Sequence, residues 1–517
     1  MEGCDALPQT EAEILAMFPG SSPALVNYTG KITGAPQRGR WGGGALAFNT
    51  VPQYSAMNSP SSYANLFIPV TSGATMYVGY WFNPASNPGS SSYPIAFMNG
   101  PNILMRLKTT MSSVSNFNNP TLISIVNGAG TTLQTVTDTF ANLSQILLDS
   151  EWYWMEVGMY AHASAGWIKV RLNNIEILSQ TGINTLFSTT VSSCTTTNGS
   201  ASLGVSSISN MSYFSVGQTI TGTNIQSGTV VTAMDYVNLV VTLSKTATGA
   251  GTNTMTVTST AIDTIGFNPS TNANATSFVD DIFVWDASGS APFNGFQSCP
   301  LYIETLNPMA DVTSNFSTQS PSEAAGNHYL NVSDMNYEDA DATYIQDGTT
   351  GHRDGFQLSY PITQNDIYAV QLYTIAKNTD ASARSIKLFC DSGTHETLSS
   401  AIAIAPLVTV SRTGNEGNYG SIVSALSATS DLSTGMVVTI SGTSWANTGT
   451  AQIIFPISSA TQVTVNNDVT PAITGSTFSF VSGSFYSKQS LLMLTDPSSA
   501  AWTVATFGGI SVGLEVQ

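Results

Sequence analysis

Two runs of the sequence decide the fold: Trp-Tyr-Trp-Met-Glu-Val-Gly-Met-Tyr at Trp152–Tyr160 and Gly-Trp-Ile-Lys-Val-Arg-Leu at Gly166–Leu172. In the second run Trp, Lys and Arg alternate with Ile, Val and Leu, which is the two-residue period of a half-buried antiparallel strand. Asn173-Asn174 follows, and Ile175–Leu178 is again largely apolar. An Asn-Asn pair between two strands favours a tight hairpin turn. We therefore predict a meander of short strands, and hence a β-sandwich.

The rest of the chain carries the same strand signals. Thr75–Phe82 is aromatic and stops at Asn83-Pro84, and Phe278–Asp286 reads Phe-Val-Asp-Asp-Ile-Phe-Val-Trp-Asp. Only Thr10–Phe18 has the pattern of a helix, because a Thr cap is followed three residues later by Glu and the run ends at Pro19-Gly20. The predicted fold class is all-β with one short N-terminal helix.

The composition excludes several classes of protein. Of 517 residues only 9% are charged, against roughly a quarter in an average soluble domain. The 14 Lys and Arg against 32 Asp and Glu leave a net charge of −18, so no basic excess exists to neutralise nucleic-acid phosphates. Hydrophobic residues make up 42%, which is too many for a disordered acidic tail. Abundant Gly, Ser, Thr and Asn disfavour a helical enzyme.

Two stretches differ from the remainder and resemble each other. Between residues 186 and 262 the only charged side chains are Asp235 and Lys245. This stretch contains Ser-Val-Gly-Gln-Thr-Ile-Thr-Gly-Thr at Ser215–Thr223, and a similar phrase returns at Ser433–Thr443. Both phrases have a Gly turn, a Val/Ile/Thr strand and a second Gly-Thr turn. We interpret the two stretches as related small β modules.

Each module interrupts a larger unit, since strand signals resume on its far side. Insertions in surface loops cost little closure entropy, so this arrangement is physically reasonable. The predicted organisation is an N-terminal arm with the short helix (1–23), a first jelly-roll sandwich (24–185 and 263–298) with an inserted β module (186–262), and a second sandwich (299–407 and 482–517) with its own inserted module (408–481).

Targeting and redox signals are sparse. Met1–Thr10 carries Glu2 and Asp5 where a secretory leader would carry Lys or Arg. No apolar run approaches the ~20 residues of a membrane helix, and no membrane partner is predicted. The four cysteines, Cys4, Cys194, Cys299 and Cys390, are scattered without a CxxC pair and are interpreted as isolated thiols. We expect a soluble, reduced chain made in the cytoplasm, although its composition is typical of exposed extracellular β proteins.

No catalytic residue is predicted. Glycoside hydrolysis needs two carboxylates facing one sugar, yet Glu151 and Glu156 lie five positions apart and face opposite sides of a regular strand. Asp280 and Asp281 are adjacent and also diverge. No E-x-D-x-x-E series or G-x-S-x-G elbow occurs. The four histidines, His162, His328, His352 and His395, lack the HxxxH or HExxH spacing of a zinc site.

No cofactor-binding or metal residue is predicted either. The acidic stretch Asp334–Asp341 would need Gly at its sixth position and Glu at its twelfth to be an EF-hand, but Asp339 and Ile345 stand there. A looser calcium site that uses Asp280 or Asp281 is the alternative to solvated loop acids or turn caps.

The aromatic and basic side chains do not predict a functional site either. Trp152, Trp154, Trp167 and Trp285 lie in strands and are interpreted mainly as core. Trp445, in a Gly-Thr-Ser-Trp-Ala-Asn turn, is the best candidate for an exposed contact, whereas Arg38 and Arg40 indicate a solvated loop.

The order of these signals resembles the concanavalin A-like, or laminin-G-like, jelly roll found in bacteriophage virion proteins. The first half of the resemblance is carried by Gly42–Leu46 after Trp41, Tyr77–Phe82, Trp152–Tyr160, Gly166–Leu178 and Phe278–Asp286. The second half is carried by Tyr302–Leu306, Gly326–Tyr329, Asn331-Val332, Asp341–Ile345 and Gly351–Asp354. The two modules resemble the small Thr/Gly-rich β domains of phage tail and fibre proteins.

This resemblance implies a non-enzymatic virion structural protein. It is expected on the virion, at the tail or the head surface, after synthesis in the host cytoplasm. Tail or tail-fibre association is the leading hypothesis, with a role in assembly and in surface display or host attachment. One alternative is a head-decoration or head-fibre protein of the capsid, and another is a glycan-binding module or depolymerase. The implied partners are other virion proteins and further copies of the chain, with a trimer favoured, and a host-surface glycan is a further candidate.

Overall fold

The computed structural model describes residues 30–35, 45–50, 66–83, 91–100, 102–110, 122–136, 152–211, 213–235, 238–268, 276–289, 293–301, 303–321, 327–333, 343–359, 367–379, 384–404, 409–411, 422–423, 437–442, 449–459, 462–465, 478–482 and 487–517. The predicted helix Thr10–Phe18, the acidic stretch Asp334–Asp341, and Arg38, Arg40, Glu151 and Trp445 lie outside these residues. Within them almost every regular element is a strand, which confirms the all-β prediction. No helix in the described part of the chain is long and apolar enough to span a membrane.

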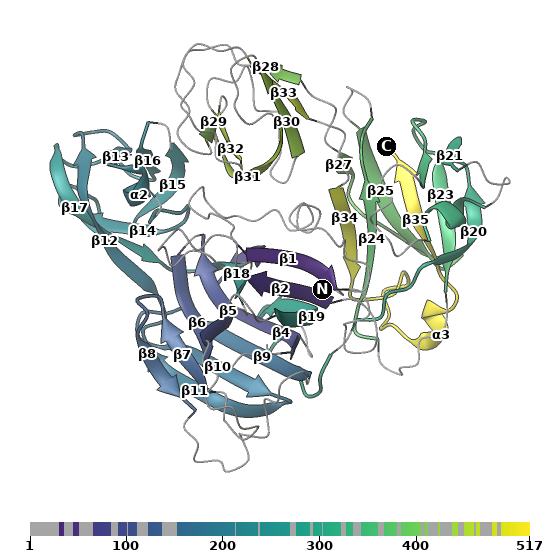
Figure 1. Ribbon diagram of the computed structural model, residues 1–517, viewed down its shortest axis with the longest axis horizontal. Coiled ribbons are helices and arrows are strands. Elements are labelled where there is room, and N and C mark those ends of the chain that lie inside the picture. Colours follow the sequence, from purple (N-terminus) through teal and green to yellow (C-terminus); the bar gives the residue numbers. More distant parts are fainter. Residues whose placement is uncertain are drawn as a thin grey trace.

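The first sandwich consists of two antiparallel sheets (Figure 1). The seven-stranded sheet has the order β1 (Gly30–Ala35), β2 (Ala45–Thr50), β19 (Thr276–Asp286), β4 (Thr75–Asn83), β9 (Tyr153–Tyr160), β10 (Gly166–Leu172) and β11 (Ile175–Ile183). The six-stranded sheet has the order β3 (Leu66–Gly73), β18 (Ile262–Asn268), β5 (Ser91–Asn99), β6 (Asn102–Thr110), β7 (Leu122–Asn127) and β8 (Thr132–Thr135). One apolar core, which includes Phe82, Phe97, Met155 and Phe267, lies between them.

The hairpin between β10 and β11 forms as the sequence predicts. Asn173 and Asn174 have positive φ angles of 48° and 67°, which the two central residues of a tight primed turn require. Leu172 pairs with Ile175 across the turn. The apolar positions of β10 enter the sandwich core, because a strand presents alternate residues to opposite faces.

The seven-stranded sheet is buried on both faces at its centre. In β9, Met155 and Val157 enter the sandwich core, whereas Trp154 belongs to a second apolar cluster on the opposite face. In β4, Tyr80 enters the sandwich core and Trp81 belongs to the cluster on the opposite face. A strand that alternates between two apolar clusters reads as a continuous aromatic run, which explains the composition of both segments.

The first inserted module is a small closed barrel between β11 and β18. Its strands are β12 (Phe187–Thr196), β13 (Ser202–Gly204), β14 (Thr219–Gly222), β15 (Thr229–Asp235), β16 (Val240–Leu243) and β17 (Gly251–Ser259), paired in the order β12-β13-β16-β15-β14-β17, with the short helix α2 (Ile208–Met211) after β13. Apolar side chains that include Val191, Phe214 and Met255 fill its interior.

The second inserted module is a six-stranded sheet between β27 (Ile402–Ile404) and β34 (Ser487–Met493). Its strands are β28 (Thr409–Ser411), β29 (Ile422–Val423), β30 (Val437–Gly442), β31 (Gly449–Ser459), β32 (Gln462–Val465) and β33 (Phe478–Ser482), in the order β28-β33-β30-β31-β32-β29. The barrel is closed, so its strands can also be read from β12 in the other direction, as β12-β17-β14-β15-β16-β13. Counted along the chain within each module, both modules then have the order first, sixth, third, fourth, fifth and second strand. The repeated phrases fall on β14 and β30, the third strand of each module, so the predicted relation between the modules is confirmed at the level of strand order.

The second sandwich is built around one sheet and a strand pair. The sheet has the order β20 (Pro308–Ser314), β23 (Arg353–Leu358), β35 (Ser511–Val516), β25 (Arg384–Asp391) and β26 (Glu396–Leu398), and β27 also pairs with β25. The pair is β24 (Val370–Ala376) with β34. Side chains of both groups pack in one cluster with Trp502 and with Phe507 of the helix α3 (Val504–Phe507). Smaller elements, β21 (Thr318–Ser320), η3 (His328–Asn331) and β22 (Tyr344–Gln346), connect β20 to β23.

Deletion of residues 408–481 should leave a folded remainder. Thr409 of β28 pairs with Val481 of β33, so the two ends of the module lie side by side and a short linker can replace it. We expect the variant to keep the near-ultraviolet circular dichroism of its tryptophans and a cooperative thermal transition. Unfolding of the whole chain on deletion would contradict the insertion.

Candidate functional site

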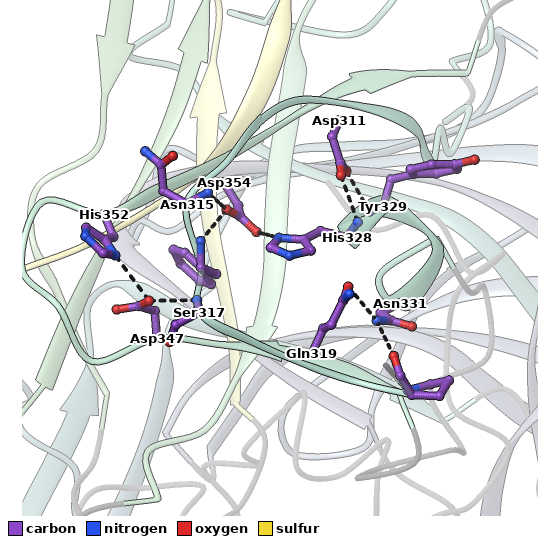
Figure 2. Close-up of polar contacts among 12 residues, drawn as sticks. Asp311, Asn315, Ser317, Gln319, His328, Tyr329, Asn331, Asp347, His352 and Asp354 are labelled. Carbon is purple, nitrogen blue, oxygen red and sulfur yellow. Dashed lines mark hydrogen bonds and ion pairs between the residues drawn. The ribbon is translucent and has the colours of Figure 1, made fainter. Parts of the chain in front are cut away.

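One cluster of ionisable side chains joins three segments of the second sandwich. We call it the His–Asp cluster, and it comprises Asp311, His328, Asp347, His352 and Asp354 (Figure 2). Asp311 lies on β20, Asp354 on β23 and His328 at the start of η3, while Asp347 and His352 lie between β22 and β23.

The centre of the cluster is a buried pair. Nδ1 of His328 lies 2.5 Å from Oδ2 of Asp354, and the two residues are 6% and 0% exposed. The other carboxylate oxygen of Asp354 accepts the backbone N–H groups of Asn315 at 2.6 Å and Phe316 at 2.9 Å. Burial raises the pKa of the Asp354 carboxyl, and the hydrogen bonds from Phe316, His328 and Asn315 oppose that rise.

The remaining carboxylates bind backbone amides. Asp311 accepts the N–H groups of His328 at 2.8 Å and Tyr329 at 2.7 Å, which are unpaired donors at the start of η3. Asp347 accepts the N–H groups of Ser317 and Thr349 and lies 3.2 Å from Nδ1 of His352. Burial of Asp347 opposes its ionisation, but these hydrogen bonds together hold its pKa well below the ordinary value.

A histidine oriented by a carboxylate is the arrangement in which many enzymes hold a general base. Such a base must also reach a nucleophile or substrate with its second ring nitrogen. In the described part of the chain, Nε2 of His328 has no recorded hydrogen bond. The hydrogen bonds of the cluster described above run within it or to backbone amides, and they connect segments 315–317, 327–329 and 347–354.

Sequence reasoning singled out segments that contain three of the five residues of this cluster. His328, His352 and Asp354 lie in segments that carry the resemblance, and the structure brings these segments together. The search for closely spaced histidines could not find the pair, because His328 and Asp354 lie 26 positions apart. Asp311 was missed because it stands in an ordinary strand. Asp347 precedes Gly348, and this Asp-Gly turn signal could have identified it.

The other two histidines have local contacts. Nδ1 of His162 accepts the backbone N–H groups of Ser164 and Ala165, and His395 contacts the neighbouring Thr394 hydroxyl. Both are turn contacts and lie apart from the His–Asp cluster.

A second candidate is the outer side of the seven-stranded sheet. We call it the aromatic face, and it comprises Tyr77, Trp81, Trp154, Glu156, Phe283 and Trp285. Trp154 and Trp285 are buried, and Trp152 and Trp167 are half-buried and pack against them. The interpretation as core side chains therefore holds for Trp154 and Trp285, whereas Trp152 and Trp167 are only partly buried.

The described residues 293–301 and 303, which we call the strap, cover the aromatic face. Nε1 of Trp285 donates to the carbonyl of Gly295 at 2.9 Å, and Nε1 of Trp81 donates to the carbonyl of Leu301 at 2.8 Å. The N–H of Gln297 donates to Oε1 of Glu156 at 2.8 Å. The aromatic tryptophans are therefore covered by the chain's own connection between β19 and β20.

Glu156 is buried at the centre of this face. It is 0% exposed, and its Oε2 has no hydrogen-bond partner among the described residues. Burial raises its pKa, while the Gln297 amide, the nearby indole N–H of Trp154, which falls short of a hydrogen bond, and the charge of Arg171 act in the opposite direction. A carboxyl group beneath the strap has no access to a polymeric sugar in this conformation.

Asp280 and Asp281 are each only 4% exposed, so they are not solvated, and they lie within β19, where the strand signal of Phe278–Asp286 places them. They lie at a bulge of β19, where Asp281 has a positive φ of 47° and its N–H donates to Oδ1 of Asp280. The bulge lets two acidic residues sit within a strand that is covered on both faces. In the described part of the chain, no three His, Cys, Asp or Glu side chains are grouped as a metal site requires.

Another carboxylate, Asp263 of β18, joins the β5–β6 turn to β18 next to the barrel. Its two oxygens accept from Nδ2 of Asn99 at 2.8 Å and from the N–H of Gly100 at 2.7 Å. The same turn contacts the barrel directly, since Nδ2 of Asn102 donates to the carbonyl of Tyr213 at 3.0 Å. The first sandwich and the barrel are thus joined by specific polar contacts in addition to their covalent connections.

No protein-family model matches the sequence, and no curated protein matches it. Among solved structures, one similar to this chain is the cellulose-induced protein Cip1, at 11% identity and a TM-score of 0.24, over 50% of this chain and 87% of that one. Another is the alginate lyase Aly36B, at 7% identity and a TM-score of 0.21, over 46% of this chain and 80% of that one. A third is tailspike protein 2 of the Escherichia coli O157:H7 bacteriophage CAB120, at 16% identity and a TM-score of 0.20, over 30% of this chain and 20% of that one. These likenesses are partial, and the function is argued below from the chain's own residues.

Proposed function

We propose that this chain is a non-enzymatic structural protein of a bacteriophage virion, associated with the tail or tail fibre, that serves in assembly and in display or host attachment. The proposal starts from the order of strand motifs in the sequence, which resembles virion jelly rolls. It is supported by an architecture in which each of two sandwiches carries a β module of one common strand order.

The observation that carries the proposal is that three carboxylates, of which Asp354 is buried and Asp311 and Asp263 are half-buried, accept backbone amides. Asp354 and Asp311 accept backbone amides of segments that join β20 to β23, and Asp263 accepts a backbone amide of the β5–β6 turn. Hydrogen bonds to an ionised acceptor are about twice as strong as neutral ones, so these contacts hold loops and modules in one geometry. Carboxylates that hold loops in a fixed geometry fit a role in assembly better than a role in catalysis.

Location in the particle is the direct test. Virus particles from a culture that produces this protein are purified on a density gradient, and an antibody raised against the purified chain is applied with gold labelling for electron microscopy. We expect peptides of the chain in the particle fraction and gold at the tail. Gold on the head would instead support the capsid-decoration role, and a protein that stays in the soluble lysate would refute virion membership.

Activity on glycans is the second test. The purified chain is applied to a glycan array and incubated with host-surface polysaccharide while reducing ends are counted. We expect no release of reducing sugar, and clear turnover would replace the structural proposal with a depolymerase. Light scattering on the same sample should give about three times the chain mass of 54.3 kDa, since appendages follow closed symmetry.

A further inference from the structure

The aromatic face holds the strap as a binding site holds an extended peptide. Side chains from four neighbouring strands contact main-chain atoms of the strap: Trp285 of β19, Trp81 of β4, Glu156 of β9 and Arg171 of β10. The guanidinium of Arg171 donates to the carbonyl of Gln297 at 3.2 Å. Recognition through main-chain groups, with pockets for a few side chains, is the general mode by which proteins bind extended segments.

Apolar side chains of the strap supply the anchors. Phe296 packs edge-on against Tyr77, with 5.2 Å between ring centroids, and the guanidinium of Arg171 lies 4.8 Å from the Phe296 ring centroid. Leu301 is buried in the aromatic cluster. Gly158 of β9 makes room for these rings, because a Cβ there would lie 2.8 Å from Tyr77 and 2.9 Å from Phe296.

The strap is nevertheless separable from the sheet it covers. No described residue between the end of β19 at Asp286 and the start of β20 at Pro308 belongs to a strand, so its departure breaks no sheet pairing. The strap sequence, Phe293 to Ile303, contains no charged side chain. Its described attachments include the four main-chain contacts above, the contact of Arg171 with the Phe296 ring, and apolar packing.

We propose that the aromatic face is a receptor for an extended peptide, that the strap occupies it as a detachable segment of the same chain, and that Glu156 makes the strap dock more tightly in acid than at neutral pH. When the strap is docked, Glu156 has one hydrogen-bonded oxygen and one buried oxygen without a partner. Undocking returns the carboxylate to water, where its ionised form is stable.

The charged and titratable groups around Glu156 decide whether docking of the strap strengthens or weakens as the pH rises. Arg171 of β10 faces it directly across the strand pair and favours its ionised form, and Tyr77 of β4 is a buried phenol whose pKa is raised by desolvation. The strap contributes no charge. Because the pKa of Glu156 is raised in the docked state, docking takes up a proton, so it is strongest below the ordinary value of 4.5 and weakens as pH rises towards the raised pKa.

Hydrogen exchange of the full chain tests the proposal. Peptides that cover residues 293–303 are followed by mass spectrometry from pH 4.5 to 7.5, with rates corrected for intrinsic exchange. We expect the opening equilibrium of the strap to rise by up to about tenfold per pH unit above 4.5, because one proton is linked to docking. Peptides from β10 should show no such change, since the sheet stays paired.

Two variants test whether Glu156, and not another acidic residue, causes the pH dependence of strap docking. Glu156→Gln keeps an oxygen that accepts the Gln297 N–H but cannot ionise, so the strap should stay protected at every pH. Glu176→Gln is the matched control, because Glu176 on β11 is 44% exposed and pairs with Lys169, and this variant should keep the pH dependence. A pH-independent strap in the unmodified chain, an unchanged slope in Glu156→Gln, or an equal slope in β10 would overturn the proposal.

A measurement on the unmodified chain keeps the test valid if Glu156→Gln does not fold. Trp154 is 0% exposed beneath the strap, so acrylamide should quench the tryptophan emission more strongly at pH 7.5 than at pH 4.5. Equal quenching at the two pH values would contradict a strap that opens.

Discussion

Asp354→Ala is expected to destabilise the second sandwich by about 3–5 kcal/mol, because it breaks a buried pair and leaves the partner groups behind. Without the carboxylate, the ring of His328 has no acceptor for Nδ1, and the N–H groups of Asn315 and Phe316 lose theirs. Each buried donor that is left without a partner destabilises the folded state, because it has given up its hydrogen bonds to water without a replacement. The loop between β20 and η3 should then open before the sheet does.

Because the chain has several folding units, the measurement must report on this unit alone. Hydrogen exchange of peptides from β23 and β35 in increasing urea gives the free energy of unfolding of the second sandwich. Asp391→Ala is the control, since Asp391 is the half-buried last residue of β25 and its carboxylate accepts the N–H of Gly393 at 2.7 Å. The control should lose about 1 kcal/mol or less. Equal losses in the two variants would show that the His–Asp cluster does not hold the loops.

The second large effect concerns the close approach of Trp154 to Gly79. Trp154→Ala removes a fully buried side chain and should destabilise the first sandwich by about 3–5 kcal/mol. Gly79→Ala alone should cost about 1–3 kcal/mol, because its Cβ would lie 2.6 Å and 2.7 Å from two ring carbons of Trp154. In the Trp154→Ala background the same change should cost much less, since of these close approaches only that to Trp285 at 3.3 Å remains.

A double-mutant cycle measures this coupling. Four chains, namely the unmodified protein, both single variants and the double variant, are compared by hydrogen exchange of peptides from β4 and β9 in urea. The expected interaction free energy is about 1–3 kcal/mol, whereas independent sites would add to within about 0.5 kcal/mol. Gly73→Ala is the control, because its Cβ would meet only the flexible end of Met76 at 3.2 Å. Additive losses at Gly79 and Trp154 would refute the steric explanation.

Much of the fold follows from local patterns along the chain. The alternation in Gly166–Leu172 and the Asn173-Asn174 turn predict the β10–β11 hairpin, because both depend only on neighbouring residues. The phrase at Ser215–Thr223 and its return at Ser433–Thr443 predict two related modules, and the shared strand order bears this out. Periodicity could not tell that the aromatic strands are covered on both faces, since a strand buried on two sides loses its alternation.

The candidate sites depend on contacts between distant residues, and local patterns could not supply them. Glu156 and Gln297 lie 141 positions apart, and the carboxylate was considered only as a partner of Glu151. The strand signal at Phe278–Asp286 predicts the place of Asp280 and Asp281 in β19, but it does not predict that both are only 4% exposed.

By itself, the sequence determined the all-β class, the hairpin and the repeated module, because strand period, turn chemistry and repetition are written in neighbouring residues. Only the tertiary structure decided that His328 meets Asp354, that the tryptophans of β4, β9 and β19 share one face, and that the strap covers it. The physical reason is that sheet register and loop closure bring distant residues together, from 26 positions apart for His328 and Asp354 to 220 for Trp81 and Leu301. Burial then changes the chemistry of a group such as Glu156, whose residue type alone indicates an exposed acid.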